Sequence, residues 1–185
     1  MRDRLAIFDM DGTLIDTCMV NFRAYQAALA EENIGLTYEY FEKECFGKGY
    51  KEYLPPLTGD DKELMERVHK RKIVLYKDYI GEARLNMALV DFLKGMKDKY
   101  YMALVTTASK KNVYNMIEHF GLEEDFDLVL AAEDIPKHKP DPEGFFMAMR
   151  RFDIPPERTV VFEDSKVGIE AAERCNASVF RVIRI

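Results

Sequence analysis

Five short apolar runs are spaced along the chain, at residues 5–8, 102–106, 128–131, 160–162 and 179–183. Short apolar runs bounded by turn residues are typical of buried strands. Segments with helical periodicity separate the last four runs. Strands that alternate with helices predict an α/β fold with a parallel sheet and right-handed crossovers.

Four helices are expected between these strands. Ser109 and Ser165 can each cap a helix, and Pro142 can begin one because its missing N–H is harmless in a first turn. Gly121 supplies a stop signal for the helix that follows Ser109. The side chains expected to face the core are Met87, Val90, Phe92, Leu93 and Met96; Val113, Met116, Ile117 and Phe120; Phe145, Phe146, Met149 and Phe152; and Val167, Ile169, Ala171 and Ala172.

Residues 16–82 break the alternation of strands and helices. Helical patterns cover residues 17–31 and 60–79, and the stretch has no convincing strand. The sequence therefore predicts a core domain made of residues 1–15 and 83–185, with a small helical domain of residues 16–82 inserted after the first strand. We expect the insertion to form a cap over the active end of the sheet.

Two acids follow the first apolar run, at Asp9 and Asp11. Strand side chains alternate, so positions two apart point toward one spot. Gly12 then lets the backbone turn sharply and come close to a ligand. Two crowded carboxylates repel each other unless a proton, a cation or a metal intervenes. This arrangement suggests a metal-assisted covalent site.

Polar residues also follow the next three runs. In open α/β sheets, ligands bind beyond the carboxyl ends of the strands, so these residues are expected to meet at one edge. They are Thr106, Thr107 and Ser109 after the second run, Lys139 after the third, and Glu163 and Asp164 after the fourth.

These residue types suit phosphoryl transfer. Mg²⁺ prefers oxygen ligands, which Asp9, Asp164 and Glu163 can supply, although Glu163 can equally act as a support behind the ligands. One carboxylate can act as the nucleophile and form an aspartyl-phosphate, and a second can protonate the leaving oxygen and later activate water. A hydroxyl and a lysine can hold the remaining phosphate oxygens.

Four segments of the chain resemble, in order and spacing, the motifs of the haloacid dehalogenase superfamily. They are Asp9-Met10-Asp11-Gly12-Thr13, Ala103-Leu104-Val105-Thr106, Lys139-Pro140-Asp141-Pro142 and Val161-Phe162-Glu163-Asp164-Ser165. The chain looks most like the subgroup with a helical cap after the first motif, which includes beta-phosphoglucomutase and phosphoglycolate-phosphatase-like enzymes. The resemblance implies a Rossmann-like core and a cap that closes over the substrate.

The resemblance also implies a role for each motif residue. Asp9 would be the nucleophile and a metal ligand, and Asp11 would be the general acid and base and lend its backbone carbonyl to the metal. Thr106 would bind the phosphoryl group, with Thr107 and Ser109 as further candidates for substrate binding. Lys139 would stabilise the charge of the nucleophile and phosphate. Asp164 would ligate Mg²⁺ with Glu163 beside it.

The expected reaction is hydrolysis of a small phosphorylated metabolite, such as a sugar phosphate. Dehalogenases of the superfamily need neither the metal nor the second acid, so Asp11 and the pair Glu163-Asp164 favour phosphoryl chemistry. A mutase resembling beta-phosphoglucomutase is the alternative, but Asn21 stands where that family usually has a histidine, and the cap loop at residues 46–50 lacks its arginine. A non-catalytic phosphometabolite-binding protein is the second alternative.

Residues of the insertion are expected to select the substrate. The candidates are Asn21, Lys48, Tyr50 and Lys72; for Lys72, a solvated lysine on a charged helix is the alternative interpretation.

Composition and net charge limit the classes of partner expected for the chain. The chain of 185 residues is 48 % hydrophobic and carries a formal net charge of -6, which disfavours nucleic acid and anionic membranes as partners. No apolar stretch approaches the roughly 20 residues that span a bilayer. Three scattered cysteines fit a reducing cytoplasm. A monomer or a weak homodimer is expected.

Overall fold

The computed structural model describes residues 2–45 and 48–183 and divides the chain into two compact units. The core unit comprises the residues up to Asp16 together with those from Arg84 onward. The inserted unit is Thr17–Ala83. Within the described ranges, no helix combines the length and the apolar composition that crossing a bilayer requires.

The core unit is built on a five-stranded sheet in the order β5-β4-β1-β6-β7. All four pairings in it are parallel. Its strands are β1 (Arg4–Phe8), β4 (Tyr100–Val105), β5 (Leu128–Leu130), β6 (Thr159–Glu163) and β7 (Ser178–Arg181). Each lies on one of the five predicted apolar runs, so the predicted α/β class is confirmed.

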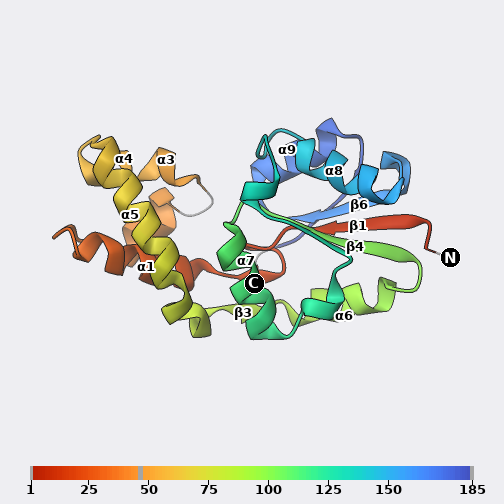
Figure 1. Ribbon diagram of the computed structural model, residues 1–185, viewed down its shortest axis with the longest axis horizontal. Coiled ribbons are helices and arrows are strands. Elements are labelled where there is room, and N and C mark those ends of the chain that lie inside the picture. Colours follow the sequence, from red (N-terminus) through yellow and green to blue (C-terminus); the bar gives the residue numbers. More distant parts are fainter. Residues whose placement is uncertain (1, 46–47, 184–185) are drawn as a thin grey trace. The chain divides into compact units, whose positions relative to one another are not determined.

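Helices cover both faces of this sheet. Figure 1 shows α8 and α9 on one side and α6 and α7 on the other. The helices are α6 (Met87–Met96), α7 (Lys110–Phe120), α8 (Glu143–Phe152) and α9 (Lys166–Arg174). Single 3₁₀ turns at Glu123–Asp125, Ala132–Asp134 and Pro156–Arg158 complete the connections.

Alternation along the strands explains the two layers. On one face Ile7 and Val161 pack against Phe145 of α8 and Ala171 of α9. On the other face the rings of Phe8 and Phe162, which are register partners, stack with centroids 4.5 Å apart. These buried apolar side chains fix the strands and hence the loops that follow them.

Three predicted core positions lie at the surface instead. Met87, Phe92 and Val167 are 60 %, 53 % and 41 % exposed. In α6 the buried stripe is narrower than predicted and includes Val90 and Leu93. Helical spacing alone gives the apolar side of a helix but not how much of that side the sheet covers.

The helix ends follow the predicted signals with one exception. The Ser165 hydroxyl accepts a hydrogen bond from the N–H of Gly168 at 3.1 Å, and Gly121 ends α7 with a positive φ of 64°. Ser109 occupies the N-cap position of α7, but its side chain makes no capping bond. The N–H of Lys110 donates to the Glu133 carboxylate at 2.7 Å, so an acid from another segment caps this helix.

The inserted unit is built from helices and helical turns. Phe22 and Leu29 of its first helix pack with Leu54 and Val68 in an apolar cluster separate from the core of the sheet. The helix predicted for residues 60–79 is α-helical only to Leu75 and continues as 3₁₀ turns. The elements are α1 (Cys18–Ala30), α2 (Tyr38–Tyr40), a π-helical turn (Phe41–Cys45), α3 (Tyr50–Tyr53), α4 (Pro55–Thr58), α5 (Lys62–Leu75) and the 3₁₀ helix Tyr76–Glu82.

A second, two-stranded sheet lies where the chain leaves and re-enters the core unit. β2 (Ile15–Asp16) pairs antiparallel with β3 (Arg84–Leu85). The sequence pattern does not predict these strands, because two residues are too few to show a period. The two connections to the inserted unit are therefore hydrogen-bonded neighbours.

Candidate active site

The parallel pairing of β1 with β6 brings the first and fourth motifs together. Phe8 is the register partner of Phe162, and the N–H of Asp9 donates to the carbonyl of Phe162 at 3.1 Å. Asp9 therefore leaves its strand beside Glu163, which ends the neighbouring one. From β1 the chain builds one side of the sheet through β4 and β5 and then crosses to β6 on the other. Ligands bind at such a switch point in open α/β sheets.

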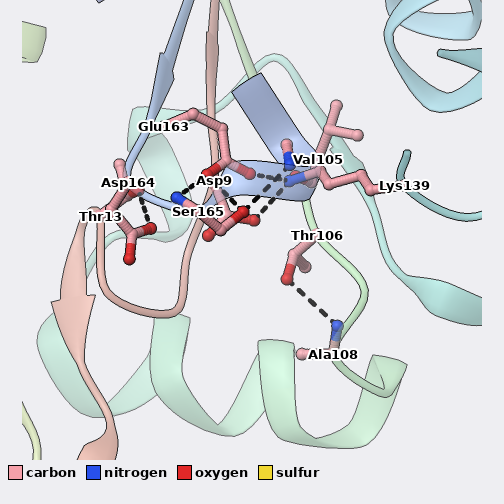
Figure 2. Close-up of polar contacts among 10 residues, drawn as sticks. Asp9, Thr13, Val105, Thr106, Ala108, Lys139, Glu163, Asp164 and Ser165 are labelled. Atoms are coloured by element: carbon pink, nitrogen blue, oxygen red, sulfur yellow. Dashed lines mark hydrogen bonds and ion pairs between the residues drawn. The ribbon is translucent and has the colours of Figure 1, made fainter. Parts of the chain in front are cut away.

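Lys139 sits at the centre of this cluster. Its ammonium donates to Asp9 Oδ1 at 2.6 Å, to Glu163 Oε1 at 2.7 Å and to the carbonyl of Val105 at 3.1 Å (Figure 2). The three contacts match the three donors of an ammonium group. The side chains of Lys139, Asp9 and Glu163 are only 7 %, 10 % and 1 % exposed. One lysine thus joins the ends of β1, β4 and β6.

The second carboxylate oxygen of Glu163 is also hydrogen-bonded. Glu163 Oε2 accepts hydrogen bonds from the N–H of Ser165 at 2.8 Å and from its hydroxyl at 3.0 Å. Gly168 on α9 leaves room for this carboxylate, since a Cβ there would lie 1.7 Å from Glu163 Oε1. Glu163 is therefore held from both sides.

Asp164 is held by the loop of the first motif. The Thr13 hydroxyl donates to Asp164 Oδ1 at 2.8 Å. Gly12 has a φ of +88°, and a Cβ on it would lie 2.3 Å from Asp164 Oδ2. Glycine is required there both by the left-handed backbone and by the close approach of the carboxylate.

Asp9, Glu163 and Asp164 each offer a carboxylate oxygen, and these three oxygens lie within 4.8 Å of one another. Burial raises the pKa of Asp9 well above its ordinary value; Lys139 lowers it, while Glu163 and Asp11 raise it further. Burial likewise raises the pKa of Asp164, against the bond from Thr13. Three carboxylates face a single ammonium in this cluster, and burial disfavours their charged forms unless a further cation is bound. An all-oxygen donor set of this kind, buried at Asp9 and Glu163 and half-buried at Asp164, fits a hard divalent cation such as Mg²⁺.

The ammonium of Lys139 keeps its positive charge in this environment, because its pKa is raised. Burial by itself would lower the pKa of its ammonium, but the carboxylates of Asp9 and Glu163 outweigh that effect and raise it. Lys139 therefore stays protonated and can serve as a fixed positive charge.

The second motif supplies hydroxyls next to the lysine. Thr106 is buried, and its hydroxyl oxygen accepts from the N–H of Ala108 at 3.1 Å, which leaves the hydroxyl proton outside that bond. Thr106, Thr107 and Lys139 line one pocket at the end of β4. The Ser109 hydroxyl is buried and has no hydrogen-bond partner in the described part of the chain. These groups are donors of the kind that phosphate oxygens accept.

Asp11 lies two residues beyond Asp9, at a backbone bridge to Ile15. Its charge is close enough to raise the pKa of Asp9. The structure thus brings together five of the predicted residues around Asp9: Asp11, Thr106, Lys139, Glu163 and Asp164.

The other candidates belong to the inserted unit. The side-chain amide of Asn21 donates to the carbonyl of Thr17 at 3.0 Å, and Lys48 pairs with Glu44 at 3.6 Å. Lys72 is buried, with its ammonium over the rings of Tyr25 and Tyr76 at 5.1 and 4.5 Å.

The alternative interpretation of Lys72 as a solvated lysine is therefore wrong. A role of Asn21, Lys48, Tyr50 and Lys72 in substrate binding stays a prediction. Residues 46 and 47 of the predicted cap loop at residues 46–50 lie outside the described residues.

Thr13 holds Asp164, and Gly168 makes room for Glu163, but the sequence pattern assigns neither residue a role. The sequence could have indicated Gly168, because a glycine inside a helix costs stability and often marks a close approach of another group. No such indication exists for Thr13, since its partner is 151 residues away.

Comparison with known proteins identifies the family. The profile of the haloacid dehalogenase-like hydrolases matches residues 6–182. The phosphorylated carbohydrates phosphatase of Thermotoga maritima is 33 % identical over 174 residues, covering 90 % of this chain and 79 % of the relative. The fructose-1-phosphate phosphatase of Escherichia coli is 28 % identical over 170 residues, covering 90 % and 89 %.

A solved structure agrees with these relatives. A variant of CbbY from Rhodobacter sphaeroides, in complex with xylulose-1,5-bisphosphate, superposes with a TM-score of 0.82 at 26 % identity, covering 97 % of this chain and 85 % of CbbY. The chain therefore belongs to the haloacid dehalogenase-like hydrolase family, and the predicted family is confirmed.

Proposed function

We propose that this hydrolase is a Mg²⁺-dependent phosphatase that acts on a small phosphorylated metabolite through an aspartyl-phosphate on Asp9. The observation that carries the proposal is the buried cluster in which one lysine joins Asp9 to Glu163, with Asp164 beside them. Phosphatase names among the relatives of the chain support the same reaction class.

In the first step, Asp9 is the nucleophile. Lys139 holds Asp9 Oδ1, so we assign the attack on phosphorus to Oδ2. A bond forms between Oδ2 and phosphorus, and the bond from phosphorus to the leaving oxygen breaks. Asp11 gives its proton to that oxygen as a general acid, and the alcohol departs.

In the second step, Asp11 acts as a general base. Its carboxylate takes a proton from a water molecule, whose oxygen attacks the phosphoryl group. The bond between phosphorus and Asp9 breaks, inorganic phosphate leaves, and Asp9 is restored. Thr106, Thr107 and Lys139 supply donors for the charge on the equatorial oxygens, with Ser109 as a further candidate.

Asp9 and Asp164, with the backbone carbonyl of Asp11, are the proposed ligands of Mg²⁺. When bound, the cation neutralises these carboxylates and draws charge from a phosphate oxygen. Both oxygens of Glu163 are already hydrogen-bonded, so we assign Glu163 to holding Lys139 and the Ser165 backbone rather than to direct ligation. A Mg²⁺ affinity that survives Glu163→Gln but not Asp164→Asn would support this division of roles.

A sugar phosphate is the proposed substrate class. The two phosphatase relatives are named for phosphorylated carbohydrates and fructose 1-phosphate, and the CbbY structure holds a sugar bisphosphate. Asn21, Lys48 and Lys72 of the inserted unit, with Tyr50, are the proposed selectors of the sugar. Hydrogen-bond donors and positive charge on these side chains suit hydroxyls and a second anionic group.

The test is phosphate release from a panel of sugar phosphates and other small phosphomonoesters, with Mg²⁺ or with EDTA. The wild type should turn over at least one substrate, and both EDTA and Asp9→Asn should abolish the turnover. Asp9→Asn keeps the size of the side chain, so circular dichroism should show an unchanged fold.

Conversion of a hexose 1-phosphate to the 6-phosphate without phosphate release would instead indicate a mutase. Saturable binding of a sugar phosphate without any turnover would indicate a non-catalytic binding protein.

A further inference from the structure

A single asparagine lies where the chain re-enters the core unit. Asn86 follows β3 directly and precedes α6, and it is only 9 % exposed. Its side-chain Oδ1 accepts a hydrogen bond from the N–H of Leu89 at 3.2 Å, which caps the helix. Its Nδ2 donates to the carbonyl of Thr13 at 3.2 Å, and its backbone N–H donates to the carbonyl of Leu14 at 2.8 Å.

Helix capping accounts for only one of the two side-chain hydrogen bonds of Asn86. Serine and aspartate cap helices about as well as asparagine does, and threonine slightly less well. Among these capping residues, only asparagine combines the accepting oxygen with an amide donor. The donor is the group that reaches Thr13, so the choice of asparagine points to the loop of the first motif.

Thr13 carries the connection onward to Asp164. Its hydroxyl donates to Asp164 Oδ1 at 2.8 Å, and the residue is 1 % exposed. The bond from Asn86 holds the backbone of Thr13, and the backbone position sets the direction of the hydroxyl. Two hydrogen bonds therefore link Asn86 to one of the proposed metal ligands.

We propose that Asn86 is a positioning residue for the metal site, acting through Thr13 on the carboxylate of Asp164. The inference rests on the proposed Mg²⁺ site and adds a residue that the four motifs do not contain. Outer partners that orient a ligand typically change metal affinity by about 10–100-fold when removed. Because Asn86 acts through an intermediate residue, we expect a smaller effect, about three- to tenfold.

The same hydrogen bond connects the segment that returns from the inserted unit to Asp164, through Thr13. β3 brings the chain back from the inserted unit, and Asn86 is the first residue after it.

The experiment measures the dissociation constant of Mg²⁺ directly, by isothermal titration calorimetry on the full chain. Asn86→Ser keeps a capping oxygen but is too short to hold Thr13, and it should weaken Mg²⁺ binding about three- to tenfold. Thr13→Val removes the donor to Asp164 and should weaken binding by at least as much. The double variant should bind no more weakly than Thr13→Val alone, because residues that act in series are not additive.

Asp61→Ala is the matched control for the loss of a helix cap. Asp61 caps α5 by accepting from the N–H groups of Glu63 and Leu64 at 2.9 and 3.1 Å, within the inserted unit. This variant should lower the melting temperature and leave the Mg²⁺ dissociation constant unchanged. If Asn86→Ser does not fold, Asn86→Asp replaces it, since aspartate keeps the shape and the cap but loses the donor.

An unchanged Mg²⁺ affinity in a folded Asn86 variant would overturn the inference while leaving the proposed function intact. Effects of Asn86→Ser and Thr13→Val that multiply in the double variant would also overturn it, because Asn86 would then act by another route. A wild-type protein that binds no Mg²⁺ would overturn this inference together with the proposed metal site.

Discussion

Replacing Gly168 by alanine should destabilise the protein, although alanine is the better helix former. A glycine-to-alanine change inside a helix normally stabilises by about 0.5–1 kcal/mol. At this position the new Cβ would lie 1.7 Å from Glu163 Oε1 and 2.0 Å from Glu163 Cδ. Glu163 is 1 % exposed, so its carboxylate cannot move without leaving Lys139 or Ser165.

The expected loss of stability depends on which contacts break when the new Cβ displaces the Glu163 carboxylate. Overpacking a core costs about 1–3 kcal/mol, and removing one partner of a buried ion pair costs about 3–5 kcal/mol. After subtracting the gain in helix propensity, we expect a net loss of about 2–4 kcal/mol in the free energy of unfolding. For a chain of this size that lowers the melting temperature by roughly 5–15 °C.

Urea unfolding followed by circular dichroism measures this loss, and phosphate release measures its effect on the site. Gly95→Ala is the matched control, since Gly95 lies in α6 and no heavy atom comes within 4 Å of its added Cβ. The control should be as stable as the wild type or slightly more so. A Gly168→Ala protein as stable as the control would refute the reasoning that Glu163 is fixed in place.

Three further predictions test other contacts. Adding Mg²⁺ in large excess should raise the melting temperature of the wild type by several degrees, and Asp164→Asn should remove that gain, because a cation that binds only the folded state stabilises it. Lys139→Met should abolish phosphate release and destabilise by about 3–5 kcal/mol, because it leaves the Asp9 carboxylate buried without its cation; urea unfolding checks the second value. Burial and the charge of Lys72 lower the pKa of His69 to about 4, from 6.5 for the free side chain. At a pH between these two pKa values, His69 binds more protons in the unfolded chain than in the folded one. The free energy of unfolding should therefore fall as the pH drops from 7 to 5. The loss is on the order of 1 kcal/mol after allowance for partial exposure, and unfolding of His69→Gln at both pH values should show a shallower dependence.

The sequence predicted the sheet and most of the candidate site for the same reason. Each apolar run had to be buried, and the polar residues that follow parallel strands necessarily gather at one edge. The sequence alone therefore groups Asp9, Thr106 and Glu163, even though they lie far apart in the chain.

Contacts that depend on tertiary geometry could not be predicted. Nothing in the local sequence indicates that Glu133 caps α7 in place of Ser109, since the carboxylate comes from another segment. The aromatic environment of Lys72 was hidden in part. Tyr76 lies four residues further along the same helical run, but Tyr25 comes from α1, and the sequence does not show that its ring covers Lys72. The sequence pattern likewise gave no role to Asn86, whose side chain bonds to Thr13, 73 positions away.

The pairing of β2 with β3 has an evolutionary consequence. Ile15 faces Leu85 across this ladder, so the two ends of the insertion are neighbours in space although 70 positions separate them in the chain. A segment whose ends meet can be lengthened, replaced or recombined without shifting either of its anchors. Lys139, which holds the Asp9 carboxylate, and Phe162, which accepts from its backbone N–H, both belong to the core unit. The architecture is modular in this sense: the insertion can diversify under selection while the chemistry stays constant.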